Sequence, residues 1–407
     1  MSSANGAAVY VIATLDTKGE EAAFVRDRLV QSGVATRLVD VGSLGDPRVA
    51  PDVSREEVFG AASGENISTD RGEAVTAAAK GATRIVLDAY ERGELAGVLA
   101  LGGSAGTAIG TQAMRALPLG LPKLMVSTLA SGDVRSYVGD KDIVMINSVV
   151  DILGLNRISR PVFRQAADAM AGMVRFAREH ENAEGTDRPM VAATMFGVTT
   201  RCVERAREIL EDAGYEVLVF HATGNGGRAM ESLIRDGFFA GVLDLTTTEL
   251  ADEIVGGVLS AGPERGTAAG EKGTPQVVSV GATDMVNFRA LDSVPVEFAK
   301  RNLHVHNPEV TLMRTTAAEN ERIGDELGTK LARASGPTTC LLPLRGVSAL
   351  DQVGEAFDDP EAREALFDSL RKASGSTTIL ELDLHINDPE FAAAAAQELI
   401  ELMEETA

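Results

Sequence analysis

The sequence predicts an α/β protein made of two doubly wound domains, each with a parallel sheet between layers of helices. Three observations carry this prediction. Short apolar runs alternate with helical segments along the chain, as parallel strands with crossover helices require. The chain has 407 residues, more than one ordinary core supports. Finally, four segments recur in the same order in the two halves.

The recurring segments indicate an internal duplication. Strands are expected at 9–14 and 36–42 in the first half, and at 190–194 and 215–224 in the second. ELAGVLALGG (94–103) then matches FFAGVLDLTT (238–247), and LPKLMVSTLASGD (121–133) matches TPQVVSVGATDMV (274–286). Chance similarity among β–α units is the alternative, but the common order favours duplication.

A polar segment at 177–189, AREHENAEGTDRP, separates the halves and has the composition of a linker. We therefore expect a first domain at 1–180, a linker at about 181–187 and a second domain at 187–407. Several helix ends also carry their usual signals. These are a C-terminal glycine at Ser32-Gly33, a capping box formed by Ser54 and Glu57, and Asp388-Pro389 between a strand at 377–387 and a closing helix.

Composition excludes several classes of protein. The 38 basic and 60 acidic residues give a net charge of −22, which repels nucleic acid. No apolar stretch is long enough to cross a bilayer, and the N-terminus lacks the pattern of a signal peptide. Cys202 and Cys340 have no metal-like spacing and fit buried thiols in a reducing cytoplasm.

Small and hydroxylated residues follow each expected strand of the first half. Because the carboxyl ends of parallel strands share one edge of a sheet, these residues are expected to converge on a ligand. The candidate binding residues are Thr14, Asp16, Thr17, Lys18, Gly42, Gly102, Gly103, Ser104, Gly106, Thr107, Ser127, Thr128 and Ser131.

The loop GGSAGT at 102–107 suits a phosphate cradle. Its glycines admit phosphate oxygens to backbone N–H groups, and a helix expected to begin near Thr107 offers its free amides. Lys18 would supply a charge to a phosphate, and Asp16 would bind ribose or reach Mg²⁺ through water. The loop is neither a Walker A motif nor a dinucleotide fingerprint. The alternatives are a bare turn, a solvated Lys18 and an Asp16 that caps a helix.

The second half offers weaker candidates for chemistry. His221 ends an expected strand beside a glycine-rich turn, where it would serve as a general acid or base, or as a wall residue. Thr246, Thr247 and Thr248 follow the next strand. His304 and His306 lack a third ligand, so no metal site is assigned. Arg314 would pair with an anionic ligand or with a carboxylate of the chain.

Several motifs resemble one known family. They are ATLDTKGEEAAFVRDRL, ALGGSAGTAIGTQAM, MINSVVDILGLNRISR, FHATGNGGRAMESLI, HVHNPEVTLMRTT and LPLRGVSALD, and they span nearly the whole chain. Together they resemble the uncharacterised protein family that includes the ATP-binding inhibitory domain of the tomato mosaic virus resistance protein. The resemblance implies two Rossmann-like domains, ATP binding and a homodimer. It also implies nucleotide contacts at Gly102, Gly103, Ser104, Gly106 and Thr107, and at Thr14, Asp16, Thr17 and Lys18.

We therefore expect a cytoplasmic protein that binds ATP, together with Mg²⁺, at the 102–107 loop near the interdomain cleft. It would be an ATP-using enzyme acting on a small anionic metabolite. The alternative is a nucleotide-gated binding or scaffold module without turnover, and an NAD-dependent oxidoreductase is a weaker third hypothesis. Neither nucleic acid nor membrane is expected as a partner.

Overall fold

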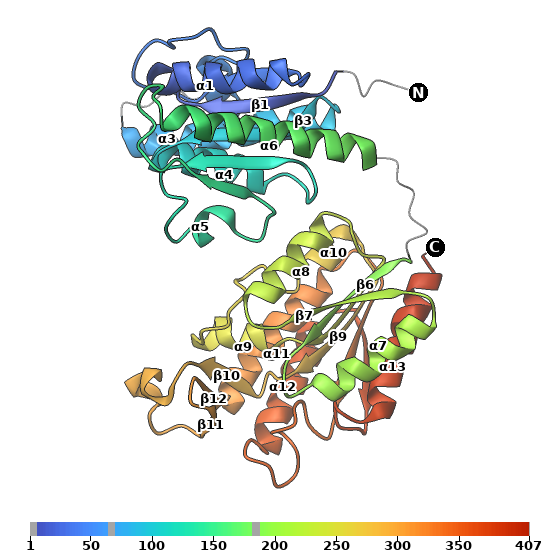
Figure 1. Cartoon of the computed structure of the whole chain (residues 1–407). Coiled ribbons are helices and arrows are strands. Elements are labelled where there is room, and N and C mark those ends of the chain that lie inside the picture. The colour runs from blue at the N-terminus through green and yellow to red at the C-terminus, as the bar shows by residue number, and fades with distance from the viewer. Residues whose placement is uncertain (1–5, 64–69, 181–187, 407) are drawn as a thin grey trace. The chain divides into compact units, whose positions relative to one another are not determined.

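A computed structural model describes residues 6–63, 70–180 and 188–406. The chain divides into two compact units, Met1–Gly185 and Thr186–Ala407, each of which is described by itself (Figure 1). The linker expected at 181–187 lies outside the described residues. The preceding residues 177–180, also expected in the linker, instead continue helix α6 (Ser159–His180), since Ala, Arg and Glu favour the helix.

The first unit is built on a five-stranded parallel sheet with the order β2-β1-β3-β4-β5. The strands are β1 (Ala8–Ala13), β2 (Thr36–Asp40), β3 (Leu95–Gly102), β4 (Lys123–Ser127) and β5 (Val144–Asn147). The helices are α1 (Leu15–Gln31), α2 (Arg55–Ser63), α3 (Arg71–Glu91), α4 (Ser104–Arg115), α5 (Arg135–Val138) and α6.

Helices cover both faces of this sheet (Figure 1). Alternate residues of β1 point to opposite faces, as the pleat of a strand requires. Tyr10 and Ile12 pack with α2, α3 and α4 on one face, while Val9 and Val11 pack with α1 and α6 on the other. Because both faces are covered, the central strands are apolar throughout.

The second unit has a six-stranded parallel sheet with the order β14-β13-β9-β8-β6-β7. Its strands are β6 (Met190–Met195), β7 (Glu216–His221), β8 (Gly241–Thr246), β9 (Gln276–Gly281), β13 (Thr338–Pro343) and β14 (Thr378–Leu382). Helices α7 (Thr200–Asp212) and α13 (Pro389–Glu404) cover one face. The other face carries α8 (Asn225–Arg235), α9 (Thr248–Val255), α10 (Ala268–Lys272), α11 (Ala317–Ala332) and α12 (Pro360–Ala373).

A small antiparallel sheet in the second unit was not expected from the sequence. It has the order β10-β12-β11, formed by β10 (Met285–Phe288), β11 (Leu303–Asn307) and β12 (Val310–Arg314). Two short 3₁₀ helices, Leu291–Ser293 and Val296–Phe298, lie between β10 and β11. The chain turns sharply after β9, where Ala282 takes a φ of +57°, so the matched segment 274–286 contains β9 and the start of β10.

The two large sheets share one topology. In chain order, the first five strands of each parallel sheet are arranged 2-1-3-4-5, and β14 adds a sixth strand to the second sheet. The predicted pair of doubly wound parallel sheets is therefore confirmed. The matched segments of the two halves fall on equivalent strands, β3 with β8 and β4 with β9, as a duplication would place them.

Most of the helix ends predicted from capping residues are confirmed. Helix α1 ends at Gln31 before Gly33, whose φ is +79°. The backbone N–H of Ser54 donates to Glu57 Oε2 at 2.7 Å, and the N–H of Glu57 donates back to Ser54 Oγ at 3.3 Å. Asp388 precedes α13, but its carboxylate accepts the N–H of His385 at 2.8 Å instead of capping the helix. That bond belongs to a turn, so β14 stops at Leu382 rather than extending to 387.

Both cysteines are free and buried, as the sequence suggests. Burial raises the pKa of each thiol to about 12, so neither is a ready nucleophile. Among the described residues, no helix is both long enough and apolar enough to span a membrane.

Candidate functional site

A cavity of about 330 Å³ opens at the carboxyl edge of the first sheet. It lies beyond β1 and β3, the neighbouring strands from which the chain proceeds in opposite directions across the sheet. Ligands of doubly wound proteins bind at this switch point. The lining residues are Thr14, Asp16, Thr17, Lys18, Val41, Ser43, Leu44, Arg71, Ala74, Val75, Gly102, Gly103, Ser104, Ala105, Gly106, Ile109 and Asp151. Eight of the thirteen predicted binding residues are among them: Thr14, Asp16, Thr17, Lys18, Gly102, Gly103, Ser104 and Gly106.

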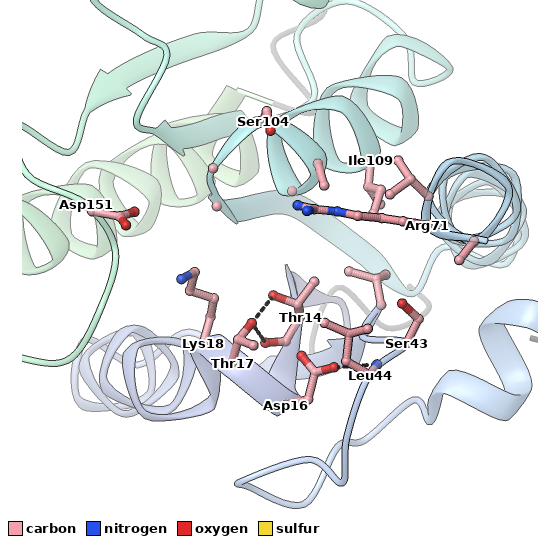
Figure 2. Close-up of a pocket in the computed structure, with 17 residues that line it drawn as sticks. Thr14, Asp16, Thr17, Lys18, Ser43, Leu44, Arg71, Ser104, Ile109 and Asp151 are labelled. Atoms are coloured by element: carbon pink, nitrogen blue, oxygen red, sulfur yellow. Dashed lines mark hydrogen bonds between the residues drawn. The ribbon is translucent and has the colours of Figure 1, made fainter. Parts of the chain in front are cut away.

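The turn after β1 is held together by its own hydroxyl groups. Thr14 Oγ1 and Thr17 Oγ1 lie 2.8 Å apart, and Thr17 Oγ1 also donates to the Thr14 carbonyl at 3.3 Å (Figure 2). The first N–H of α1, that of Leu15, donates to Asp40 Oδ1 at 3.0 Å. Part of the α1 N-terminus is therefore already satisfied by a buried carboxylate of the unit.

Asp16 shapes the floor of the cavity. Its Oδ2 accepts the N–H groups of Leu44 at 2.9 Å and Gly45 at 3.3 Å, and so holds the loop that follows β2. Gly42 does not line the cavity. A Cβ at position 42 would lie 2.7 Å from Asp16 Cγ, so this glycine admits the Asp16 carboxylate and not a ligand.

The glycine loop presents an open helix N-terminus. Helix α4 begins at Ser104, three residues before the expected start near Thr107. Gly103 is its N-cap and supplies no side chain to bond the first amides. The N–H groups of Ser104, Ala105 and Gly106 have no acceptor among the described residues. Such an end carries partial positive charge and free donors, which favour an anion.

Gly102 and Gly106 have a packing role. A Cβ on Gly102 would lie 2.7 Å from the Cα of Gly106. The two glycines therefore let the end of β3 and the first turn of α4 approach each other closely. Gly103 differs from both, because a Cβ there would meet only Thr128 Oγ1, at 3.7 Å.

Four predicted hydroxyl residues do not line the cavity. Thr107 and Ser127 are buried and bond each other, with their oxygens 2.6 Å apart. Since α4 starts earlier than expected, Thr107 lies a full turn into the helix and packs against β4 instead of facing a ligand. Thr128 donates its backbone N–H to the Gly102 carbonyl at 3.3 Å, and Ser131 is exposed beyond it.

Two cationic side chains line the cavity. The Lys18 ammonium donates to the carbonyl of Ile152, and the carboxylate of Asp151 lies on the same side of the cavity (Figure 2). Arg71 reaches into the cavity from the first turn of α3, and its guanidinium bonds none of the described residues. Arg71 was not predicted as a binding residue, because it follows no strand. A cation in the first turn of a helix opposes the helix dipole, and this was the available signal.

Apolar side chains form a further part of the cavity wall. They come from the end of β2 and from two helices: Val41, Leu44, Ala74, Val75 and Ile109. Leu44 is strongly exposed for a leucine, at 83%. None of these residues was predicted, since an apolar residue at a helix or strand end is more often part of the core.

The equivalent edge of the second unit is filled by the unit's own side chains. Thr246, Thr247 and Thr248 are buried, and Thr246 Oγ1 lies 2.8 Å from the Thr199 hydroxyl, so these side chains pack inside the unit. His221 is exposed and packs edge-to-face on Phe196, with ring centroids 5.8 Å apart. Arg314 is buried and pairs with Asp351 at 3.4 Å, which is the carboxylate alternative.

A buried charge cluster lies behind this edge. The Arg265 guanidinium bonds Asp244 Oδ1 at 2.7 Å, Glu249 Oε2 at 2.6 Å and Glu231 Oε1 at 3.4 Å, and all four side chains are buried. Glu249 also accepts the N–H groups of Gly224 at 2.6 Å and Gly227 at 3.1 Å. These amides belong to the N-terminus of α8, so Glu249 occupies the place that an external anion would take.

Asp252 makes the stability of the second unit sensitive to pH. Burial raises the pKa of this carboxyl from 3.8 to about 7. The folded state therefore prefers the neutral acid, and the free energy of unfolding should fall as pH rises from about 4 through 7. We expect the fall to be on the order of 3 kcal/mol in urea titrations. Asp252→Asn should flatten this dependence, whereas Asn at the exposed Asp325 should leave it unchanged. Equal slopes in both variants would contradict the assignment to Asp252.

Comparison with known proteins places the chain in a family. Family models described as the N-terminal and C-terminal domains of Uncharacterised protein family (UPF0261) match residues 7–179 and 188–403. A UPF0261 protein of Clostridium tetani is 50% identical, covering 97% of this chain and 99% of its own length. The ToMV resistance protein Tm-1(GCR237) of Solanum lycopersicum is 41% identical, covering 98% of this chain and 56% of the tomato protein.

Likeness to solved structures is weak. UDP-GlcNAc 2-epimerase from Neisseria meningitidis, bound to UDP-GlcNAc, is 9% identical and aligns over 98% of this chain and 99% of its own, with a TM-score of 0.23. A score this low supports no argument about the site. The sequence relatives and family models instead confirm the resemblance predicted from the motifs. The chain belongs to the uncharacterised protein family UPF0261.

Proposed function

We propose that the first unit binds ATP, with its phosphates at the N-terminus of α4. One observation carries the proposal: three unpaired backbone N–H groups and two cationic side chains border one cavity at the switch point of the sheet. Neutral donors and cations together suit a polyphosphate in a protein of net charge −22. The resemblance to the family that includes the ATP-binding inhibitory domain of the tomato mosaic virus resistance protein agrees with this chemistry.

The remaining wall suits the nucleoside. Leu44, Val75 and Ile109 offer apolar surface to a base, while the α4 N-terminus takes the phosphates. A volume of about 330 Å³ lies within the range of small-ligand sites. Asp151 is the carboxylate best placed to contact Mg²⁺ on the phosphates, directly or through water, because one oxygen of Asp16 already accepts two amides. The metal would neutralise phosphate charge.

The cavity favours binding without rapid turnover. The described residues that line it include no His, Cys or Glu, and of its two carboxylates Asp16 already accepts two amides while Asp151 is assigned to the metal, which leaves no carboxylate free to act as a base. We therefore place the nucleotide-gated binding module ahead of an ATP-using enzyme. An ATPase assay with small organic acids added one at a time would reverse that order if any acid produced turnover.

The direct test of the proposed function is calorimetric titration of the purified protein with ATP, with and without Mg²⁺. We expect saturable binding at one site per chain, and NADH serves as the control. Failure of ATP to bind under both conditions would rule the proposal out. Tighter binding of NADH would favour the oxidoreductase hypothesis instead.

Two further properties are proposed on the family resemblance. We propose a homodimer in the cytoplasm, and two buried free thiols agree with a reducing compartment. Light scattering after size-exclusion chromatography would test the dimer, since a mass near 42.7 kDa would mean a monomer.

Removing either cation of the cavity should weaken ATP binding. Lys18→Met and Arg71→Met each remove a charge-assisted contact to phosphate, and we expect each to raise the Kd by about tenfold to a hundredfold. The salt dependence of the Kd should also become shallower. Lys80→Met, at an exposed position of α3 outside the cavity, is the matched control. Unchanged calorimetric affinity in both cavity variants would place the phosphates elsewhere.

A further inference from the structure

The loop between β5 and α6, residues 148–158, is fastened to α1 at two points. The Lys18 ammonium donates to the carbonyl of Ile152, and the backbone N–H of Gly154 donates to Glu21 Oε1 at 2.6 Å. Lys18 lies three residues before Glu21, at a kink of α1 where its own backbone is not helical (φ −121°, ψ 18°). Glu21 is buried, whereas Lys18 lines the cavity. One fastening of the loop therefore belongs to the proposed nucleotide site.

The loop is held in a strained conformation. Val149 has a φ of +66°, in the left-handed region that a β-branched residue rarely adopts. Its side chain is 68% exposed, and that of Leu153 is 71% exposed. Neither Val149 nor Leu153 is buried, so the strain is offset by the fully buried Ile152, which packs in the core beside α1, and by the two hydrogen bonds to α1.

We infer that the β5–α6 loop changes conformation with nucleotide occupancy, with Lys18 as the link; this inference rests on the proposed function. An ammonium at the Ile152 carbonyl gains more from a phosphate, which bears full negative charge. When no Mg²⁺ bridges the two groups, the same phosphate also repels the Asp151 carboxylate, which lies one residue from Ile152 and lines the cavity. Both effects loosen the loop from α1, and the strain at Val149 favours its departure. The apolar side chains of Val149 and Leu153 are then presented differently when ATP is bound.

Hydrogen exchange tests the inference directly. With saturating Mg²⁺-free ATP, we expect the amides of residues 150–156 to exchange about tenfold faster, while those of β1 and β3 do not accelerate. Ligand binding generally slows exchange by stabilising the native state, so local acceleration is distinctive. Bound ATP with unchanged or slower loop exchange would overturn the inference but leave the proposed function intact. Failure of ATP to bind in calorimetry would overturn both.

A second arm needs no nucleotide. Lys18→Met removes the bond to Ile152 and should accelerate exchange of the same amides to a similar degree, whereas Lys80→Met should not. Val149→Gly relieves the positive φ, and we expect several-fold slower exchange in the loop and a smaller response to ATP. If Lys18→Met leaves exchange in the loop unchanged, Lys18 is not the link.

Discussion

Replacing Gly103 by valine should raise the Kd for ATP by at least about a hundredfold while leaving the first unit folded. Gly103 caps α4 with a φ of −81°, which valine adopts readily, and its Cβ would stand 3.7 Å from the nearest foreign atom. The isopropyl group would nevertheless cover the first amides of α4, where a phosphate oxygen must approach to about 3 Å. Losing two such charge-assisted bonds accounts for the factor. Calorimetry measures the change in the Kd for ATP, and thermal unfolding shows whether the first unit remains folded.

Two other glycines separate the effect on binding from an effect on folding. Gly60→Val, at an exposed position of α2 with open space around it, should change neither affinity nor the unfolding midpoint by much. Gly102→Val should destabilise the unit, since its Cβ would lie 2.7 Å from the Cα of Gly106. A Gly103→Val variant that binds ATP like the parent would refute the α4 phosphate site.

Arg265→Met should destabilise the second unit by about 4 kcal/mol. The guanidinium bonds three buried carboxylates, and methionine fills much of its volume without neutralising them. Those carboxylates must then take up protons or water in the interior, and either change costs free energy. Because the uncompensated charge is negative, the loss should be smaller at pH 5 than at pH 8. Urea denaturation at both pH values measures the prediction.

Arg235→Met provides the comparison for Arg265. Arg235 is part-exposed and pairs with Glu264 at 3.7 Å and Glu271 at 3.3 Å, in contact with solvent. Exposed pairs of this kind contribute less than about 1 kcal/mol. Equal losses in the two variants would mean that the Arg265 side chain stabilises by its volume and not by its charge.

The sequence predicts the fold well because the strands of parallel sheets leave a strong pattern. β3 is apolar along its whole length and β8 along most of it, and Gly102 and Gly103 end the apolar run of β3. The small antiparallel sheet was not predicted. The chain leaves β9 and enters this sheet through the positive φ of Ala282, and alanine has no preference for such a turn that the sequence could reveal.

The candidate site is only half predictable for a similar reason. Residues that directly follow a strand, such as Thr14 and Gly103, have positions set by local sequence. Thr107 instead lies inside α4, which starts three residues earlier than expected, and Ser127 is the last residue of β4, so their hydroxyl groups bond each other. Arg71 enters from α3, a helix whose placement depends on packing against α4 and on the apolar face of the sheet. The position of the Arg71 side chain therefore cannot be predicted from a local sequence motif.

Glu249 gives the second unit a tethered ligand of its own. A carboxylate attached to the same chain acts at an effective concentration that a free anion in solution does not reach. The amides of Gly224 and Gly227 are therefore satisfied at all times, whatever the supply of phosphorylated metabolites. The two units share one sheet topology, but the second fills the N-terminus of α8, after its second strand, with its own carboxylate, whereas the N-terminus of α4, after the third strand of the first unit, has no acceptor among the described residues.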